Sequence, residues 1–310
     1  MAKADDTLKR IRNIGIRLDK AQQRQLRRMS DLETEFFTRL IDRLLADVRT
    51  DGNGRIVRQN RIKLTKLVDD VLKEMKASGL GRITEAAVKD MEQLLNDRRG
   101  YYKPFAKTSK RQYTAITRSV NRELRKWLGF TQQGNLVPRG YLDKLVTDPK
   151  FGNDVKQIIS KAVIGGKPVA KLHKELRQNI LSREDAPGLF RRHAGTLVHD
   201  AYAQFDRITN DEFRKRLKLQ FGMYAGGLRE TSRKFCIDRN GKIYHRSELK
   251  KFSEDKNLPL TKEEKEAGGP IGYDAAKDCG RFNCVHAFNW MSREIAAALG
   301  KKVSDFPKAA

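Results

Sequence analysis

Cysteine and histidine side chains gather near the carboxyl end of the sequence. All three cysteines lie there, Cys236, Cys279 and Cys284, together with His245 and His286. Thiolate sulfur and imidazole nitrogen are the ligands that zinc prefers, and a small irregular subdomain with little core gains stability from a tetrahedral metal ion. We therefore predict a structural zinc site whose ligands are Cys236, Cys279, Cys284 and His286, with His245 as the substitute for Cys279.

The chain around the last cysteine is predicted to be a strand from Asn283 to Met291. Alternate residues of a strand point the same way, so Cys284 and His286 share a face with Phe288 and Trp290. A simple core face has the same pattern, so two other interpretations stay open. The cysteines are small buried hydrophobic residues with His286 bonded to a backbone carbonyl, or two of them form a disulfide.

Recognisable catalytic patterns are missing from the sequence, and we predict no catalytic residue. Gly166 and Lys167 are followed by Pro168, where a phosphate-binding loop needs Ser or Thr, and no Gly-x-Ser-x-Gly elbow occurs. One enzymatic alternative is kept, a metal-dependent nuclease or toxin-like enzyme acting on nucleic acid. Its candidate residues are His245, Asn283, His286 and Asn289. In such an enzyme a histidine activates water and a metal ion holds the phosphate.

The charge of the chain points to a polyanion as partner. The 310 residues include 65 Lys and Arg against 39 Asp and Glu, a formal net charge of +26. Self-repulsion of this size opposes compaction, so we interpret the excess cation as a contact surface for a polyanion, nucleic acid first and an acidic membrane surface second. We predict contact with double-stranded DNA, without sequence specificity, through a set of basic residues: Arg24, Arg27, Arg28, Arg98, Arg99, Lys103, Lys107, Lys110 and Arg111.

Aromatic residues are interleaved with the second group of these cations. Tyr101, Tyr102 and Phe105 would stack on bases if the segment binds single strands. The alternative is a solvated loop with the two tyrosines packed beneath it.

The elements that carry these residues are predicted to be mainly helical. Apolar residues between Leu8 and Val48 recur every three or four positions, which is typical of one helical face. Further amphipathic segments are expected at 64–75, 83–95, 109–128, 155–162, 169–180 and 188–219. After Phe221 glycine residues become more frequent and interrupt the helical pattern. We expect short strands within 219–224 or 235–244. We also expect an exposed loop at 250–272 and a closing helix from Ser292 to Leu299.

The predicted fold class is therefore mainly α, with an elongated N-terminal helical region and a smaller α+β C-terminal domain. The predicted divisions are an N-terminal helical hairpin or bundle at 1–130, a Gly- and Pro-bearing linker at 131–153, and a C-terminal domain at 154–310 that ends in the Cys/His-containing part. No apolar run is long enough to span a membrane, and the first ten residues lack the apolar region of a secretory signal.

Short motifs between about Asp154 and Trp290 resemble, in order, the minor head protein family of tailed phages, often called the Mu F-like or head morphogenesis family. The motifs are Ile164–Pro168, Arg191–Gln204, Tyr224–Gly227, Thr231–Cys236, Gly241–Tyr244 and Gly280–His286. The last resembles the family's closing Cys-Arg-Cys or Cys-Arg-His element, with Val285 where Arg is commoner. Cys279 is additional to the pattern.

This resemblance covers a little under half of the chain and implies a virion component, not an enzyme. It implies a minor capsid protein made in the host cytoplasm and located in the head interior or at the portal vertex. The implied partners are the portal protein, the capsid protein and packaged DNA, which the protein would contact during assembly or ejection.

Overall fold

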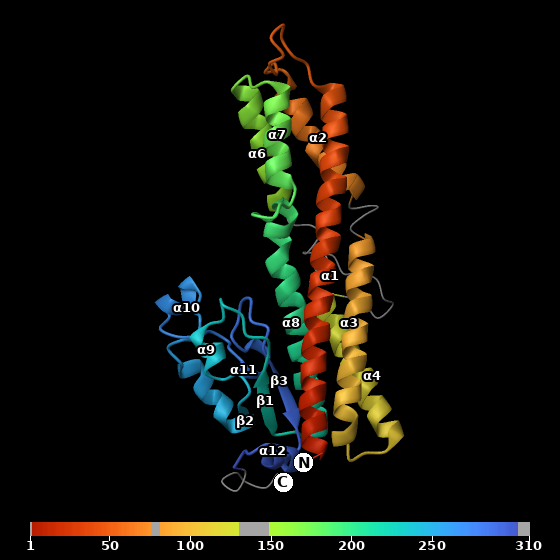
Figure 1. The fold of residues 1–310 in the computed structure, drawn as a ribbon, viewed down its shortest axis with the longest axis vertical. Coiled ribbons are helices and arrows are strands. Elements are labelled where there is room, and N and C mark those ends of the chain that lie inside the picture. Colours follow the sequence, from red (N-terminus) through yellow and green to blue (C-terminus); the bar gives the residue numbers. More distant parts are fainter. Residues whose placement is uncertain (1, 76–80, 130–148, 303–310) are drawn as a thin grey trace. The chain divides into compact units, whose positions relative to one another are not determined.

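The computed structural model describes residues 2–75, 81–129 and 149–302, and it confirms the predicted fold class (Figure 1). Long helices dominate the first two thirds of the chain, and a small antiparallel sheet lies in the last third. The helices up to the sheet are α1 Ala2–Asp47, α2 Asn60–Met75, α3 Gly81–Tyr102, η2 Lys103–Phe105, α4 Lys110–Leu128, α6 Pro149–Ile164, α7 Val169–Ile180 and α8 Leu189–Leu217.

The C-terminal part alternates short strands with short helices. Its elements are β1 Phe221–Ala225, α9 Lys234–Ile237, β2 Ile243–His245, η3 Arg246–Glu254, α10 Lys262–Glu266, α11 Ala275–Asp278, β3 Ala287–Met291 and α12 Arg293–Ala298. The closing helix is as predicted, with Ser292 as its N-cap and Gly300 in the left-handed conformation just past its end.

Two compact units make up the chain, and neither is continuous in sequence. Unit 1 contains Met1–Ala21, Asp90–Thr131 and His199–Ala310, and unit 2 contains Gln22–Lys89 and Gln132–Val198. The predicted divisions at 1–130 and 154–310 follow chain order, whereas the unit boundaries fall inside α1, α3 and α8. Most of the predicted linker lies outside the described residues, and its last residues, from Pro149, begin α6 and are helical.

Unit 2 is a helical bundle with its own apolar core. Its core residues come from α1, α2, α6 and α7, including Phe36, Leu64, Val155 and Leu176, which are completely buried. Phe36 and Phe151 meet edge to face with their ring centroids 4.8 Å apart. These helices form because each one has a single apolar face, and the four faces are buried together.

Unit 1 contains the sheet, whose strand order is β2-β1-β3 with both pairings antiparallel. Gly222 in the central strand lies opposite Tyr244 on one side and Trp290 on the other. A Cβ added at Gly222 would approach the Trp290 ring to 2.9 Å, so glycine allows the large aromatic side chains of β3 to cover the strand. Phe288 and Trp290 share the face predicted for them and stack with centroids 5.5 Å apart.

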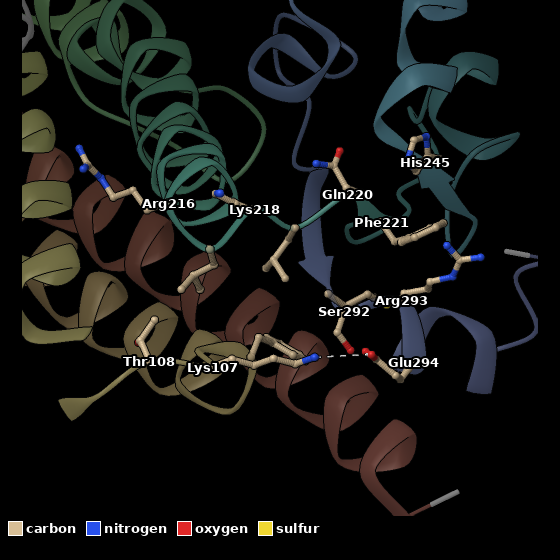
Figure 2. A pocket seen from close by; sticks show the side chains of 14 residues that line it. Lys107, Thr108, Arg216, Lys218, Gln220, Phe221, His245, Ser292, Arg293 and Glu294 are labelled. Carbon is tan, nitrogen blue, oxygen red and sulfur yellow. Dashed lines mark ion pairs between the residues drawn. The ribbon is translucent and has the colours of Figure 1, made fainter. Parts of the chain in front are cut away.

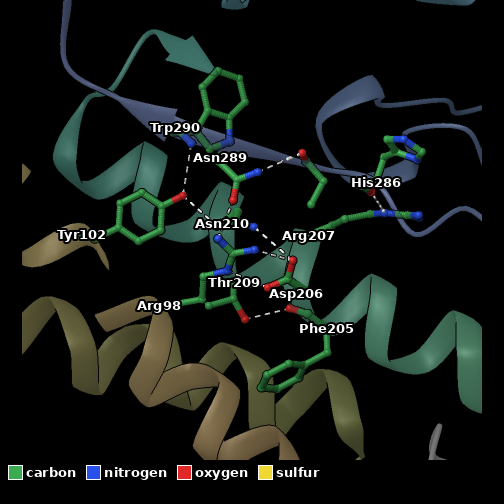
Figure 3. Close-up of polar contacts among 11 residues, drawn as sticks. Arg98, Tyr102, Phe205, Asp206, Arg207, Thr209, Asn210, His286, Asn289 and Trp290 are labelled. Atoms are coloured by element: carbon green, nitrogen blue, oxygen red, sulfur yellow. Dashed lines mark hydrogen bonds and ion pairs between the residues drawn. The ribbon is translucent and has the colours of Figure 1, made fainter. Parts of the chain in front are cut away.

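Helix α3 reaches β3 through polar side chains (Figure 3). The Tyr101 hydroxyl donates to the Trp290 carbonyl at 3.1 Å, and the Trp290 amide donates to the Tyr102 hydroxyl at 3.4 Å. Arg98 donates two hydrogen bonds to Asp206 of α8 and one to Asn289 of β3, each 2.6 Å long. Helices α3 and α8 are therefore joined to the sheet by a buried network.

Two predictions for the C-terminal part need correction. The strand predicted from Asn283 begins at Ala287, because Arg281 and Asn283 adopt positive φ angles of 62° and 55° and form a turn. The exposed loop predicted at 250–272 contains the end of η3 and all of α10, each beginning with a capping box. Among the described residues, no helix is both long and apolar enough to cross a membrane.

Candidate metal centre

Three of the predicted ligands, Cys236, Cys284 and His286, come together in unit 1. The two sulfur atoms are 3.7 Å apart, and the Cys284 sulfur is 3.7 Å from Nδ1 of His286. The three ligand atoms lie within 4.8 Å of one another, and all three side chains are buried. This group could hold a metal ion.

The two shorter spacings, sulfur to sulfur and Cys284 sulfur to His286 nitrogen, fit tetrahedral zinc. With Zn–S bonds of ~2.3 Å and a Zn–N bond of ~2.0 Å, two thiolates are separated by ~3.8 Å and a thiolate and an imidazole nitrogen by ~3.5 Å. A disulfide would need the sulfurs at ~2.05 Å, and all three cysteines are free. Nor is His286 held by a backbone carbonyl: its Nδ1 faces Cys284, and its buried Nε2 has no hydrogen-bond partner in the described part of the chain.

Helix α9 brings Cys236 to the centre, and the turn before β3 brings Cys284 and His286. Arg233, the N-cap of α9, joins the two pieces by donating to the Gly280 carbonyl at 2.6 Å and the Phe282 carbonyl at 2.5 Å. The Gly280 amide donates to the Cys284 sulfur at 3.3 Å. Both thiols therefore sit on backbone that arginine and amide hydrogen bonds hold in place.

Two glycines make room for the centre. A Cβ at Gly280 would lie 2.5 Å from the Cys236 sulfur and 3.0 Å from the Cys284 sulfur. A Cβ at Gly226 would lie 2.7 Å from Cα and 2.8 Å from Cγ of His286. Because real Cβ atoms do not approach other atoms so closely, both positions require glycine for packing.

Tyr224 of β1 covers the group from the sheet side. Its hydroxyl is 3.4 Å from the Cys236 sulfur and 3.6 Å from the Cys284 sulfur, and its ring stacks on His286 with an interplanar angle of 11°. Burial raises the pKa of the Tyr224 phenol well above its ordinary value, and the neighbouring thiols add to this effect. The phenol is thus a neutral partner to the sulfur atoms.

Arg207 of α8 holds the ligand-bearing turn from the helical side (Figure 3). Its buried guanidinium donates to the carbonyls of Cys284 and His286, the latter at 2.9 Å, and to that of Asp278 at 3.3 Å. Among the described residues, no carboxylate lies within ion-pair distance of Arg207, in contrast to Arg98 with Asp206. Burial lowers the pKa of Arg207, and the nearby groups Cys279, Cys284, Tyr224 and Asp200 raise it against that effect.

The contact between the two thiols shifts their pKa values in opposite directions. The hydrogen bond from Cys236 lowers the pKa of the Cys284 thiol well below its ordinary value, and Arg207 and His286 lower it further. The same hydrogen bond raises the pKa of Cys236, and burial raises it further. The first deprotonation of the pair is therefore easy, which suits a cationic ligand.

Cys279 and His245, the other two predicted ligand positions, lie outside this group. Cys279 is completely buried, and burial raises the pKa of its thiol. Its backbone carbonyl accepts a hydrogen bond from Tyr273 at 2.7 Å. His245 caps η3, with Nδ1 2.8 Å from the Ser247 hydroxyl.

The predicted nucleic-acid residues separate into exposed and buried positions. The prediction that Arg98 contacts nucleic acid needs correction. Arg98 is 3% exposed and paired with Asp206, so its side chain has no access to phosphate. Tyr101 and Tyr102 are also buried, which confirms that they are packed and removes them as stacking platforms, but they end helix α3 and do not lie under a loop. Arg28 is half-buried, and the remaining predicted cations are exposed, namely Arg24, Arg27, Arg99, Lys103, Lys107, Lys110 and Arg111.

The residues of the nuclease alternative occupy different environments. His286 is buried against Tyr224, and Asn289 is buried with its side chain accepting from Arg98. His245 packs on Phe221 with ring centroids 5.0 Å apart. Asn283 is exposed in the turn, where its amide donates to Asp200 at 2.9 Å.

Sequence reasoning found both cysteines and the histidine but missed Tyr224 and Arg207 as their neighbours. Tyr224 carried a weak signal, since it begins the Tyr-Ala-Gly-Gly motif. Arg207 carried none, because it is one of many arginines on a basic helix.

The chain matches no protein-family model, and no curated protein or solved structure shows significant similarity to it.

Proposed function

We propose that the chain is a minor head protein of a tailed phage, associated with the portal or inner capsid and in contact with packaged DNA during assembly or ejection. One observation carries the proposal. The neighbouring motifs Tyr224–Gly227 and Thr231–Cys236 meet the distant motif Gly280–His286 at one buried centre. Such convergence is expected if the motifs are the parts of one domain.

The centre itself is proposed to be a structural zinc site. Cys236, Cys284 and His286 are each less than 5% exposed, so a substrate has no path to them. They link α9 to the turn before β3, two short elements that a bound metal ion would hold together. The proposed role of the metal ion is to stabilise the fold. Burial of the three ligands does not favour the enzymatic alternative, because an enzyme needs a site that its substrate can reach.

DNA contact is proposed for the exposed cations that remain from the predicted set. Arg99, Lys103, Lys107, Lys110 and Arg111 form one stretch from the end of α3 to the start of α4 in unit 1. Exposed lysine and arginine contact phosphates without reading sequence. This fits a protein that meets packaged DNA of any sequence.

Detection in particles tests the virion assignment. Phage particles from the host that produces this chain are purified by density gradient, treated with nuclease and protease, and analysed by quantitative mass spectrometry. We expect peptides of the chain at a few copies per portal ring, protected until the heads are opened. Their absence from DNA-filled and empty heads alike would overturn the assignment.

Metal analysis tests the centre. We expect about one equivalent of zinc in the purified protein and its loss in Cys284→Ser. Cys279→Ser is the matched control, since it also removes a buried thiol but lies outside the group, and it should keep the zinc. A folded wild-type protein without metal, after purification free of chelators and with added zinc, would refute the metal site.

A further inference from the structure

A pocket unrelated to the metal centre opens in unit 1 where α8 ends (Figure 2). Its volume is about 420 Å³, at the lower end of the range for ligand sites. It is bounded by the segment after η2, the turn from α8 into β1, and the passage from β3 into α12. Its lining includes Lys107, Arg216, Lys218, Leu219, Phe221 and Met291.

The pocket combines an apolar floor with a basic rim. Leu219, Phe221 and Met291 line the pocket, are each less than 10% exposed, and are called its floor below. Lys107, Arg216, Lys218 and Arg293 supply positive charge, and among the described lining residues Glu294 is the one acid. Glu294 faces Lys107 at 3.8 Å, but both side chains are largely exposed and the pair is weak (Figure 2).

Lys218 occupies a position that favours glycine. It ends α8 with φ 54°, and the Leu219 amide donates back to the Arg214 carbonyl at 3.0 Å, the bond of a Schellman cap. Lysine in the left-handed conformation strains the backbone, and glycine would not. Such strain points to a use for the side chain, and Lys218 is exposed at the pocket.

We propose that this pocket binds a peptide segment of a partner protein in which an apolar side chain is flanked by carboxylates. The apolar side chain fills the floor, and the carboxylates pair with Lys218 and Lys107, while Arg216 is held by Glu212 at 3.6 Å. Charge complementarity and the apolar base together define this occupant. The pocket is defined by its own residues and stands whether or not the chain is a head protein.

Duplex DNA matches the rim but not the floor. Its outer surface presents phosphates and sugars, and its bases are stacked inside, so it offers no apolar group that projects into a cavity. Phosphate contact would therefore leave Leu219, Phe221 and Met291 unused. An acidic peptide with an apolar anchor uses both parts of the pocket.

Fluorescence anisotropy with three labelled hexapeptides tests the proposal on the full chain. The probes are Asp-Glu-Asp-Trp-Asp-Glu, a neutral version, Asn-Gln-Asn-Trp-Asn-Gln, and an anchorless version, Asp-Glu-Asp-Ala-Asp-Glu. We expect the first to bind at least about tenfold more tightly than either other peptide, because each lacks one of the two interactions. A duplex of 20 base pairs serves as competitor.

Variants separate binding from folding. Lys218→Gly should weaken binding of the first peptide about fivefold while leaving the melting temperature unchanged or higher, because it relieves the left-handed strain. Glu294→Gln should strengthen binding, since it removes the one acid that competes for Lys107. Lys250→Glu, an exposed change outside the pocket, should alter binding by less than about twofold.

Three results would overturn the proposal. Equal binding of the anchorless peptide would show that charge alone is recognised. Unchanged binding by Lys218→Gly, with the protein folded, would remove the pocket from the interaction. Displacement of the first peptide by the duplex, with the same loss of duplex binding in Lys218→Gly but not in Lys250→Glu, would make this a phosphate site instead.

Discussion

At the scale of single residues, the metal centre depends on two glycines that allow its atoms to pack closely, as much as on the chemistry of its ligands. Gly226 lies against the backbone and ring of His286, and Gly280 lies against both sulfur atoms. Neither glycine is needed for a positive φ, since neither has one. They are required because no side chain fits between Gly226 and His286, or between Gly280 and the sulfur atoms of Cys236 and Cys284.

Gly226→Ala is therefore expected to displace His286. The added Cβ meets backbone atoms, which cannot move aside as a flexible side chain can, so we expect a loss of about 1–3 kcal/mol in the free energy of unfolding. Zinc content should fall with it. Denaturant unfolding and metal analysis of the same samples measure both effects.

The neighbouring Gly227 is the matched control. A Cβ there meets nothing within 4 Å, so Gly227→Ala should change the free energy of unfolding by less than about 0.5 kcal/mol and keep the metal. Equal behaviour of the two variants would argue against the tight contact at His286.

Residue types and spacing predicted part of this centre. Cys236, Cys284 and His286 were identifiable because thiols and imidazoles are scarce and chemically distinctive. Cys279 is just as distinctive, and only the path of the backbone places its sulfur outside the group. Arg98 and Arg207 were hidden, since burial of an arginine depends on partners such as Asp206 that come from distant elements.

At the scale of elements, an ion pair fixes the turn that precedes Cys284. Glu264 of α10 accepts hydrogen bonds from Arg281 in the turn and from the amides of Thr261 and Ile271, both at 2.9 Å. These bonds, that from Arg281 foremost, lower the pKa of the Glu264 carboxyl from 4.5 to about 2. A short helix is thereby joined to the ligand-bearing turn.

This lowered pKa gives a pH prediction. Glu264 is ionised in the folded protein at pH values where it is protonated in the unfolded chain. Its contribution is thus fully present above pH 4.5 and is lost as the pH falls toward 2. Glu264→Gln should destabilise the protein at pH 7, and the difference from wild type should shrink across that window, measured as urea midpoints.

Glu263→Gln provides the comparison. Glu263 is the exposed neighbour on the same short helix, and its removal should leave the pH profile unchanged. A constant difference between wild type and Glu264→Gln from pH 7 to pH 2 would contradict the assigned role.

Helices were predicted better than strands for a physical reason. The long amphipathic helices repeat one pattern over many residues, so their positions are close to those observed. The strands have three to five residues, too few for a period to show. The capping box from Thr261 to Glu264 is readable in the sequence, yet its helix is only five residues long, too short for an apolar period to distinguish it from a loop.

At the scale of the whole molecule, the net charge of +26 is the dominant property. We predict that DNA binding weakens steeply with salt, in proportion to the phosphates neutralised. Replacing Lys103, Lys110 and Arg111 by Glu should reduce the slope of log K against log salt by about 3. Filter binding or gel shift over a salt series measures it.

The control carries the same charge change elsewhere in unit 1. Lys250, Lys251 and Lys256 are exposed and outside the predicted set, so their replacement by Glu should lower the slope far less. Equal slopes for the two triple variants would mean that binding depends on net charge and not on the stretch between α3 and α4.

The hydrogen bonds that join Tyr101 and Tyr102 of α3 to strand β3 affect how copies of this chain can associate. A sheet edge with free amides and carbonyls recruits strands from other chains and seeds aggregates. At one edge of the sheet, the hydroxyls of Tyr101 and Tyr102 form hydrogen bonds with the backbone carbonyl and amide of Trp290 in β3. At the opposite edge, strand β2 is only three residues long. The sheet is therefore a poor template for strand addition, and copies of the chain that meet in solution are not expected to polymerise through it.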